Sequence, residues 1–351
     1  MILYPLTPKG GVFVLKLGSF FKENPPSRVD FSFVMVFWRG ESNPSKCNAD
    51  ARCWRRHDKA KQLLSPRKRG DNANLSPWQR LHCFIICDIF STINLQGAAV
   101  MNIVQSFYDN MASEYDKLFL DWQATTKEQA VILDKIFCEN GYHRNTKILD
   151  CACGIGTQAI GLAALGYDVT GSDISDGELA EAKARAAKNN VSIRLKQADF
   201  CALSDVFSQQ FDIVIAMDNA LPHMLSQNAL ATAIQSIAGR VKPGGMFVAS
   251  IRDYDALLAE KPPYSPPYIH QTDKGQRVSF QTWDWNDDCY KLTQYIIDDG
   301  DTLQTSKFVC EYRATRRDEM TDLLYANGCS SVVWKFPEET GFYQPIVIAS
   351  K

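Results

Sequence analysis

The feature that most constrains the fold is a glycine-containing turn between two apolar runs, in KILDCACGIGTQAIGLAALGYDVTGSDIS, residues 147–175. The first run ends in Asp150, the turn holds Gly154 and Gly156, and the second run ends in Asp173. An apolar run, a glycine turn, a helix-like segment and a second apolar run indicate two parallel strands joined by a helix. Because ligands of such folds bind beyond the carboxyl ends of the strands, this turn is predicted to line a binding site.

The residues of this turn do not suit a phosphate. A P-loop carries Lys and then Ser or Thr after its last glycine, whereas Gly156 is followed by Thr-Gln. Asp150, directly before the turn, would repel a pyrophosphate but suits an ammonium group. Asp173 stands about 20 residues further on, where a carboxylate binds both ribose hydroxyls. A nucleoside that also carries an amino acid fits this set, and S-adenosylmethionine (AdoMet) is such a molecule.

Alternation of strands and helices continues along the chain and predicts an α/β fold, a parallel sheet covered by helices on both faces. The predicted strands are Lys147–Cys151, Tyr167–Ser172, Ser192–Gln197, Phe211–Met217 and Gly245–Ile251. The predicted helices begin at Thr157 and span Asp176–Lys188 and Gln227–Arg240. After a proline-rich segment, an antiparallel meander is predicted at Arg277–Trp285, Tyr290–Ile297 and Leu303–Arg313. A helix at Arg317–Ala326 and strands at Ser331–Phe336 and Tyr343–Ala349 complete the chain.

The first hundred residues differ from the rest in charge and in pattern. Residues 1–100 carry 15 Lys and Arg against 7 Asp and Glu, whereas residues 101–351 carry 23 against 33. The basic segment lacks helical or strand periodicity, so it reads as a non-native extension translated from a misassigned start, as a disordered tail, or as a basic arm. We therefore predict one domain at 101–351, with an antiparallel β insert at about 262–313 that acts as a lid.

The net charge and the cysteine spacing limit the classes of substrate and metal that the chain is expected to bind. The net acidic charge of residues 101–351 disfavours a nucleic acid substrate, which requires a basic surface, and favours a small molecule. The 11 cysteines form no CxxC pair and no common zinc pattern, so we expect reduced thiols, a cytoplasmic location and no metal. The apolar stretches are too short to span a membrane. Whether the chain forms a homo-oligomer is left open.

With these motifs the sequence resembles the class I AdoMet-dependent methyltransferases, whose first motif has the form D-x-x-x-G-x-G. The resemblance covers residues 101–351 and implies a Rossmann-like sheet of seven strands whose last strand runs antiparallel. It implies that Asp199, in KQADF, accepts the adenine amino group and that Phe200 contacts the ring. The strand in FDIVIAMDNALPHM and the turn in VKPGGMFVAS complete the pattern. The residues that it assigns to the cofactor are Tyr108, Asp150, Ala152, Gly154, Gly156, Asp173, Ile174, Asp199, Phe200, Met217 and His223.

A narrower resemblance is to the glycine and sarcosine N-methyltransferases. It is carried by Ala152 in the glycine turn, by an Asn-x-x-x-His segment from Asn219 to His223, and by Arg-x-Tyr-Asp in IRDYDALL. In that family the Arg holds the substrate carboxylate, the Asn lies at the substrate, and tyrosines line the methyl-transfer site. The resemblance therefore implies a catalytic set of Asn219, Arg252, Tyr295 and Tyr312. An N-terminal Arg of that family is at best Lys127 here, and a second N-terminal tyrosine is either Tyr115 or replaced by Phe119.

These resemblances predict that the chain transfers a methyl group from AdoMet to a small-molecule amine, an amino acid such as glycine or sarcosine. One alternative is an O- or N-methyltransferase for another metabolite, with the same cofactor site. Another is a cofactor-binding protein without catalysis, which would not need the substrate-binding residues Asn219, Arg252, Tyr295 and Tyr312. An RNA methyltransferase is disfavoured by the acidic charge, unless the basic first hundred residues belong to the protein.

Overall fold

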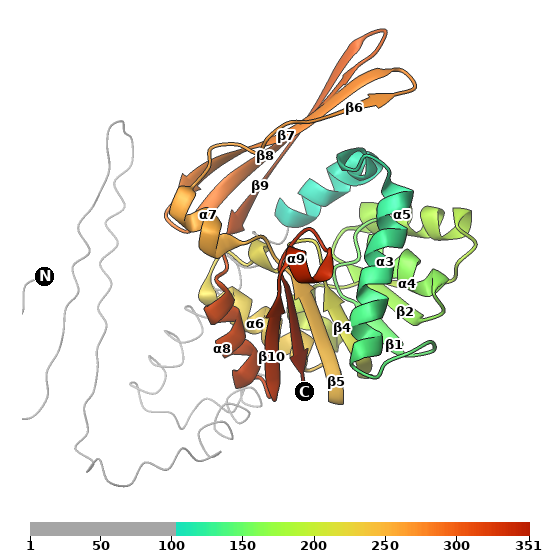
Figure 1. Ribbon diagram of the computed structural model, residues 1–351, viewed down its shortest axis with the longest axis vertical. Coiled ribbons are helices and arrows are strands. Elements are labelled where there is room, and N and C mark those ends of the chain that lie inside the picture. Colours follow the sequence, from blue (N-terminus) through green and yellow to red (C-terminus); the bar gives the residue numbers. More distant parts are fainter. Residues whose placement is uncertain (1–102) are drawn as a thin grey trace, which may run out of the picture. The chain divides into compact units, whose positions relative to one another are not determined.

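The computed structural model describes residues 103–351, and the predicted N-terminal extension lies outside this range. A helical segment at 103–111 and the 3₁₀ helix η3 (Ala112–Leu118) open the described part. A central sheet of seven strands follows (Figure 1). In spatial order its strands are β3 (Arg194–Gln197), β2 (Asp168–Asp173), β1 (Lys147–Asp150), β4 (Phe211–Ala216), β5 (Val241–Ser250), β11 (Ile346–Ser350) and β10 (Ser331–Lys335).

The strand directions confirm the predicted fold. Strands β1 to β5 pair in parallel, and β11 pairs antiparallel with both β5 and β10. The helices are α3 (Trp122–Glu139), α4 (Thr157–Ala164), α5 (Asp176–Lys188), α6 (Gln227–Ala238), α7 (Tyr254–Glu260), α8 (Arg317–Ala326) and α9 (Pro337–Thr340), with 3₁₀ turns η4 (Phe200–Asp205) and η5 (Leu221–His223). The sequence did not predict α7 or α9, because helices of seven and four residues are too short to show a clear periodicity. None of the described helices is long and apolar enough to cross a bilayer.

Alternating side chains of the strands build two apolar layers, one on each face of the central sheet. In β4, Ile213 and Ile215 pack toward α3 and α4, whereas Val214 and Ala216 pack toward α6 and α8. All four of these side chains are fully buried. A strand buried on both faces reads as a continuous apolar run, which is why the sequence predicted these strands well.

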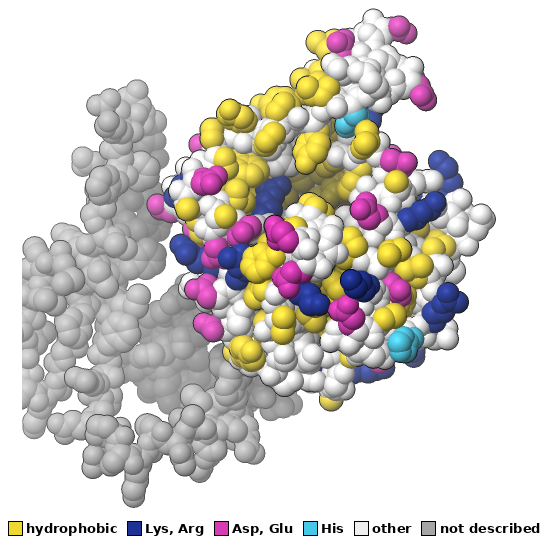
Figure 2. Space-filling view, viewed as in Figure 1, with side chains coloured by type: hydrophobic (Ala, Val, Ile, Leu, Met, Phe, Trp, Pro, Cys, Tyr) yellow, Lys and Arg dark blue, Asp and Glu magenta, His cyan; other side chains and the backbone are white. Residues whose placement is uncertain are grey.

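A second sheet of four antiparallel strands lies between β5 and α8 in the chain. Its strands, in order, are β6 (Tyr268–Thr272), β7 (Gly275–Asn286), β8 (Cys289–Asp299) and β9 (Leu303–Arg313). Figure 1 shows this sheet in orange at one end of the central sheet. The sequence predicted β7, β8 and β9 but not the short edge strand β6. Figure 2 shows a hollow beneath this sheet, walled largely by hydrophobic side chains.

Candidate active site

The glycine turn between β1 and α4 has the backbone shape that its sequence requires. Gly154 (φ 51°) and Gly156 (φ 90°) both lie in the left-handed region, which glycine adopts without a steric penalty. A Cβ atom at Gly156 would lie 2.8 Å from Cδ1 of Ile160 in α4. Glycine at position 156 therefore lets the turn pack closely against the first turn of α4.

Two acids end the strands beside this turn. The Asp173 carboxylate accepts hydrogen bonds from the backbone N–H of Gly154 at 2.9 Å and of Ser175 at 3.0 Å, which fixes it against the turn. Burial raises the pKa of Asp173, and these N–H groups act in the opposite direction. Asp150 is fully buried, and neither of its oxygens has a partner of good geometry among the described residues. Burial also raises the pKa of Asp150.

A first cavity of about 60 Å³ lies over the turn. Its lining includes these residues that the sequence assigned to a cofactor: Tyr108, Ala152, Gly154, Asp173, Ile174, Phe200, Met217 and His223. Asp150 and Gly156, which the sequence also assigned to the cofactor, are not among the residues that line this cavity. Asp199 also stands outside it, because its side chain caps η4 by accepting a hydrogen bond from the N–H of Cys201 at 2.7 Å. The lining contains Thr157, Gln158 and Asp218 as well, which sequence analysis did not single out.

A second cavity of about 570 Å³ adjoins the first beneath the four-stranded sheet. Tyr108, Tyr115 and Asp218 line both cavities, so these side chains stand where the two meet. The predicted residues Asn219, Arg252 and Tyr312 line the second cavity, and so do both Tyr115 and Phe119, the two positions considered for a second N-terminal tyrosine. The structure thus brings together residues from the start of the described range, the end of β4, the end of β5 and β9.

Arg252 follows β5 and reaches into the second cavity. Its guanidinium donates to the hydroxyl of Tyr290 at 2.7 Å and to Oε1 of Gln281 at 3.0 Å. It also lies over the rings of Trp283 and Tyr312, at 5.1 and 5.6 Å from their centroids. These partners are all uncharged, and no described carboxylate lies within ion-pair distance of Arg252.

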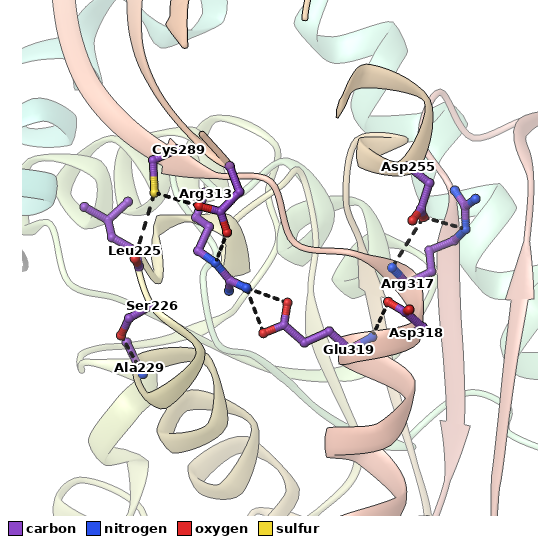
Figure 3. Close-up of polar contacts among 10 residues, drawn as sticks. Leu225, Ser226, Ala229, Asp255, Cys289, Arg313, Arg317, Asp318 and Glu319 are labelled. Atoms are coloured by element: carbon purple, nitrogen blue, oxygen red, sulfur yellow. Dashed lines mark hydrogen bonds and ion pairs between the residues drawn. The ribbon is translucent and has the colours of Figure 1, made fainter. Parts of the chain in front are cut away.

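The acids next to Arg252 in the sequence are bound by another arginine. Arg317, at the start of α8, pairs with Asp253 at 2.5 Å and with Asp255 at 3.1 Å. Figure 3 shows Arg317 turned toward Asp255. Nearby, Arg313 at the end of β9 binds Glu319 of α8 through both carboxylate oxygens (Figure 3). These ion pairs fix the end of the second sheet to α8 and leave Arg252 without a competing acid.

Asn219 supports Arg252 from the end of β4. Its Oδ1 accepts a hydrogen bond from the backbone N–H of Arg252 at 3.0 Å. The side chain is buried, and its Nδ2 has no partner among the described residues. A buried donor without a partner costs about 1–3 kcal/mol, so this amide suits a ligand with an acceptor.

An aromatic wall joins the two cavities. The hydroxyl of Tyr108 lies 2.8 Å from Nε2 of His223, and the His223 ring packs on Tyr312 with centroids 4.2 Å apart. Burial lowers the pKa of His223 to about 3, so its imidazole is neutral at physiological pH. A neutral ring in this position contributes shape and one hydrogen bond rather than charge.

Tyr295 lies away from this site, which corrects its predicted catalytic position. It pairs with Phe280 across β7 and β8, and the two rings stack with centroids 5.0 Å apart. Because side chains alternate along a strand, Tyr295 faces the opposite side of the sheet from Gln294, which lines the second cavity. Tyr290, five residues earlier in β8, is the tyrosine that contacts Arg252 instead.

Lys127 does not take the place of the N-terminal arginine. It is exposed on α3 and lines neither cavity. The α3 residues that line the second cavity are Thr125, Glu128, Gln129 and Ile132. Oε1 of Gln129 accepts from Nε2 of Gln158 at 2.6 Å. Among the described residues no group of three or more His, Cys, Asp or Glu could hold a metal ion.

Comparison with known proteins supports a methyltransferase fold. Residues 148–245 match the family model of a methyltransferase domain. The glycine/sarcosine N-methyltransferase of Parasynechococcus marenigrum (strain WH8102) is 28% identical over 154 residues, which are 44% of this chain and 53% of that protein. The glycine N-methyltransferase of Mus musculus is 29% identical over 187 residues, 50% of this chain and 62% of that protein. The chain thus matches little more than half the length of these relatives.

Solved structures share the fold. An S-adenosylmethionine-dependent methyltransferase from Clostridium acetobutylicum ATCC 824 aligns with a TM-score of 0.54 at 18% identity, over 69% of this chain and 97% of that one. The amino pentose methyltransferase CalS10 from Micromonospora echinaspora aligns with a TM-score of 0.54 at 15% identity, over 68% and 94%. At these identities the likeness is one of fold.

Proposed function

We propose that this chain, which carries a class I AdoMet-dependent methyltransferase domain, transfers the methyl group of AdoMet to the nitrogen of a small amine that bears a carboxylate. The observation that carries the proposal is the position of Arg252, a guanidinium in the second cavity with uncharged partners. Its planar fork matches a carboxylate with two parallel hydrogen bonds.

The residues of the first cavity fit AdoMet. The carboxylate of Asp173 still has lone pairs for ribose hydroxyls beyond the two N–H groups that it accepts. Gly154 lets the backbone approach a ligand, and the partly buried ring of Phe200 offers a face to an adenine. The buried carboxyl group of Asp150 has no hydrogen-bond partner among the described residues, and a cationic ligand in the same region would favour its ionised form. When bound, AdoMet supplies a methyl group on a sulfonium, whose sulfur leaves as a neutral thioether.

The chain's own residues then have to position the acceptor and exclude water. Arg252 and the free Nδ2 donor of Asn219 bind the acceptor carboxylate at one end of the second cavity. The junction formed by Tyr108, Tyr115 and Asp218 lies between the two cavities, where the acceptor nitrogen must meet the methyl carbon. Orienting two bound reactants in this way accounts for most of the rate that such a transfer needs.

The size of the second cavity favours a second candidate, an acceptor larger than glycine or sarcosine. At about 570 Å³ the cavity has room for a side chain beside the amine and the carboxylate. Trp283 and Leu292 in its wall, which pair across β7 and β8 on the face of Gln294, offer apolar contacts to such a side chain. The relatives named for glycine and sarcosine support methyl transfer to an amine. The volume of the second cavity supports an acceptor larger than those two amino acids.

Replacing Arg252 with Lys tests the proposal. The purified protein is first incubated with labelled AdoMet and a panel of glycine, sarcosine and other amino acids. Arg252→Lys should lower kcat/KM for the best acceptor by about 10- to 100-fold, because Lys cannot form the two parallel bonds. The affinity for AdoMet, measured by calorimetry, should be unchanged.

Two controls make the result specific. Arg277→Lys changes an arginine of β7 that pairs with Asp298 and does not line either cavity, so kcat/KM should be retained. An acceptor whose carboxylate is replaced by an amide should be poor for the wild type and little affected by Arg252→Lys. Equal losses for both acceptors would make Arg252 structural, and turnover of none of the amines would refute the proposed function.

A further inference from the structure

Asp218 carries a carboxyl group at the junction of the two cavities. Of the acids in the described residues, it is the one that lines both. It follows β4 with φ 54°, and Asn219 follows it with φ 68°, so two successive residues other than glycine adopt left-handed backbone. Strained backbone of this kind persists where the surrounding structure holds it, and it concentrates at functional sites.

The contacts of Asp218 hold its carboxylate without neutralising it. Oδ2 accepts from Nε2 of Gln158 at 2.8 Å, and Oδ1 accepts from the hydroxyl of Tyr343 at 2.9 Å. No described Lys, Arg or His forms an ion pair with Asp218. A carboxylate has about four acceptor positions, so this one can accept further N–H groups.

The second cavity thus contains an oriented carboxylate, Asp218, and an oriented guanidinium, Arg252, that do not pair with each other, and the other acid of its lining, Glu128, is exposed on α3. Asp218 and Arg252 both line it, and each is fixed by uncharged hydrogen-bonding partners. Two unpaired opposite charges in one cavity complement a ligand that carries both charges itself. An amino acid has such a structure, with its nitrogen and its carboxylate a few bonds apart.

We propose that Asp218 binds the acceptor nitrogen while Arg252 binds the acceptor carboxylate, so that the second cavity selects amino acids by both ends. This inference rests on the proposed function. The acceptor reacts as the free amine, after its ammonium group has released one proton to water. The nitrogen lone pair then forms the new bond to the methyl carbon as the carbon–sulfur bond breaks, and the electron pair of that bond stays on sulfur. Positive charge therefore moves onto the nitrogen, where the Asp218 carboxylate stabilises it in the transition state.

Two substitutions test Asp218 while preserving its backbone. Asn adopts left-handed φ more readily than most residues, and Gly adopts it freely, so Asp218→Asn and Asp218→Gly should both fold. For the amino acid with the highest turnover, kcat/KM should fall by about 10- to 100-fold in both variants, as expected for loss of a charge-assisted hydrogen bond. The dissociation constant of AdoMet should stay within about twofold of the wild type, because the proposed partner of Asp218 is the acceptor nitrogen and not the cofactor. A loss of about 1.4 kcal/mol would instead raise this constant tenfold.

A matched control and a matched ligand sharpen the test. Asp212→Asn alters an acid at the other end of β4 that binds Lys242 outside both cavities, and it should leave kcat/KM unchanged. The carboxylic acid with the skeleton of the best amino acid and hydrogen in place of the amino group keeps the carboxylate for Arg252 but offers Asp218 no N–H or O–H donor. As a competitive inhibitor it should bind the wild type and Asp218→Asn equally.

Each outcome separates this inference from the proposed function. If the wild type methylates an amino acid and both Asp218 variants do so equally well, the inference fails and the proposed function stands. If AdoMet affinity falls as much as kcat/KM, Asp218 binds the cofactor instead, and the inference is again wrong. If the wild type methylates no carboxylate-bearing amine, both fail together.

Discussion

Arg252 is available to a ligand because Arg317 binds the acids beside it. The sequence pattern indicates Arg252 as a ligand-binding residue. It does not show whether the neighbouring Asp253 or Asp255 forms an ion pair with it. That question depends on α8, which begins far along the chain, and on the ion pairs that Arg317 forms from there. At the scale of single residues, the sequence pattern therefore predicts which side chains bind a ligand. It does not predict the ion-pair partners of those side chains.

A test of the first cavity is Asp173→Ala. We expect the affinity for AdoMet to fall at least about tenfold, because each charge-assisted hydrogen bond contributes roughly 1.5–3 kcal/mol. The N–H groups of Gly154 and Ser175 also lose their acceptor, so the free energy of unfolding should fall by about 1–3 kcal/mol. Calorimetry with AdoMet and urea denaturation measure the two effects.

Asp168→Ala is the control for this substitution. Asp168 begins the same strand, where it pairs with the exposed Arg194 and lines neither cavity. Its removal should leave AdoMet affinity unchanged. Equal affinities for Asp173→Ala and the wild type would remove Asp173 from the cofactor site.

His223 makes a pH-dependent contribution to stability. Its pKa is about 3 in the folded chain and about 6.5 when unfolded, because burial disfavours the charged ring. Between these values the unfolded chain binds more protons, so the contribution is complete above pH 6.5 and is lost as the pH falls toward 3, at up to about 1.4 kcal/mol per unit. His223→Asn should therefore lose less stability than the wild type on acidification from pH 7 to 5. Denaturation curves of both proteins at the two pH values decide this, and parallel losses would contradict it.

At the scale of elements, the packing of α4 on α3 depends on one small residue. A Cβ atom at Gly161 would lie 2.6 Å from the backbone oxygen of Thr126 and 2.7 Å from Cβ of Ala130. The two helices can approach this closely only because position 161 has no side chain. The close contact places Gln129 beside Gln158, and through it beside Asp218.

Gly161→Ala is expected to destabilise the protein, although alanine has a higher helix propensity than glycine. Alanine in a helix interior normally gains about 1 kcal/mol over glycine. Here it forces backbone apart, and overpacking of a buried contact costs about 1–3 kcal/mol, so the net change in the free energy of unfolding should be a loss. Ala184→Gly, on the exposed face of α5, measures the propensity alone. A gain in melting temperature for Gly161→Ala would show that α3 moves aside freely.

Periodicity predicted the regular elements and left the faces of the second sheet undetermined. The limits of α5, β9 and α8 agree with the prediction, because each begins or ends at a clear change of pattern. Strand β8 was predicted as well, but a period of two fits either face of a sheet. The sequence therefore could not tell that Tyr290 rather than Tyr295 faces Arg252.

At the scale of the whole molecule, the order of motifs was sufficient for the architecture. The alternating apolar runs and the glycine turn predicted the parallel sheet, and the resemblance supplied the antiparallel β11. The meeting of the two cavities was not predictable, since Tyr108, Tyr115 and Asp218 come from separate parts of the chain. The interpretation of residues 1–100 remains a prediction outside the described range.

The four-stranded sheet enters the chain at a single point, after β5, so the wall that it gives the second cavity comes from one contiguous segment. The matched methyltransferase domain, residues 148–245, ends before these strands. Substitutions on the cavity face of β7 and β8 can therefore change the shape of the second cavity and leave the glycine turn as it is. Asp218 and Asn219 lie outside the insert, so the part of the cavity that they line is set by the central sheet.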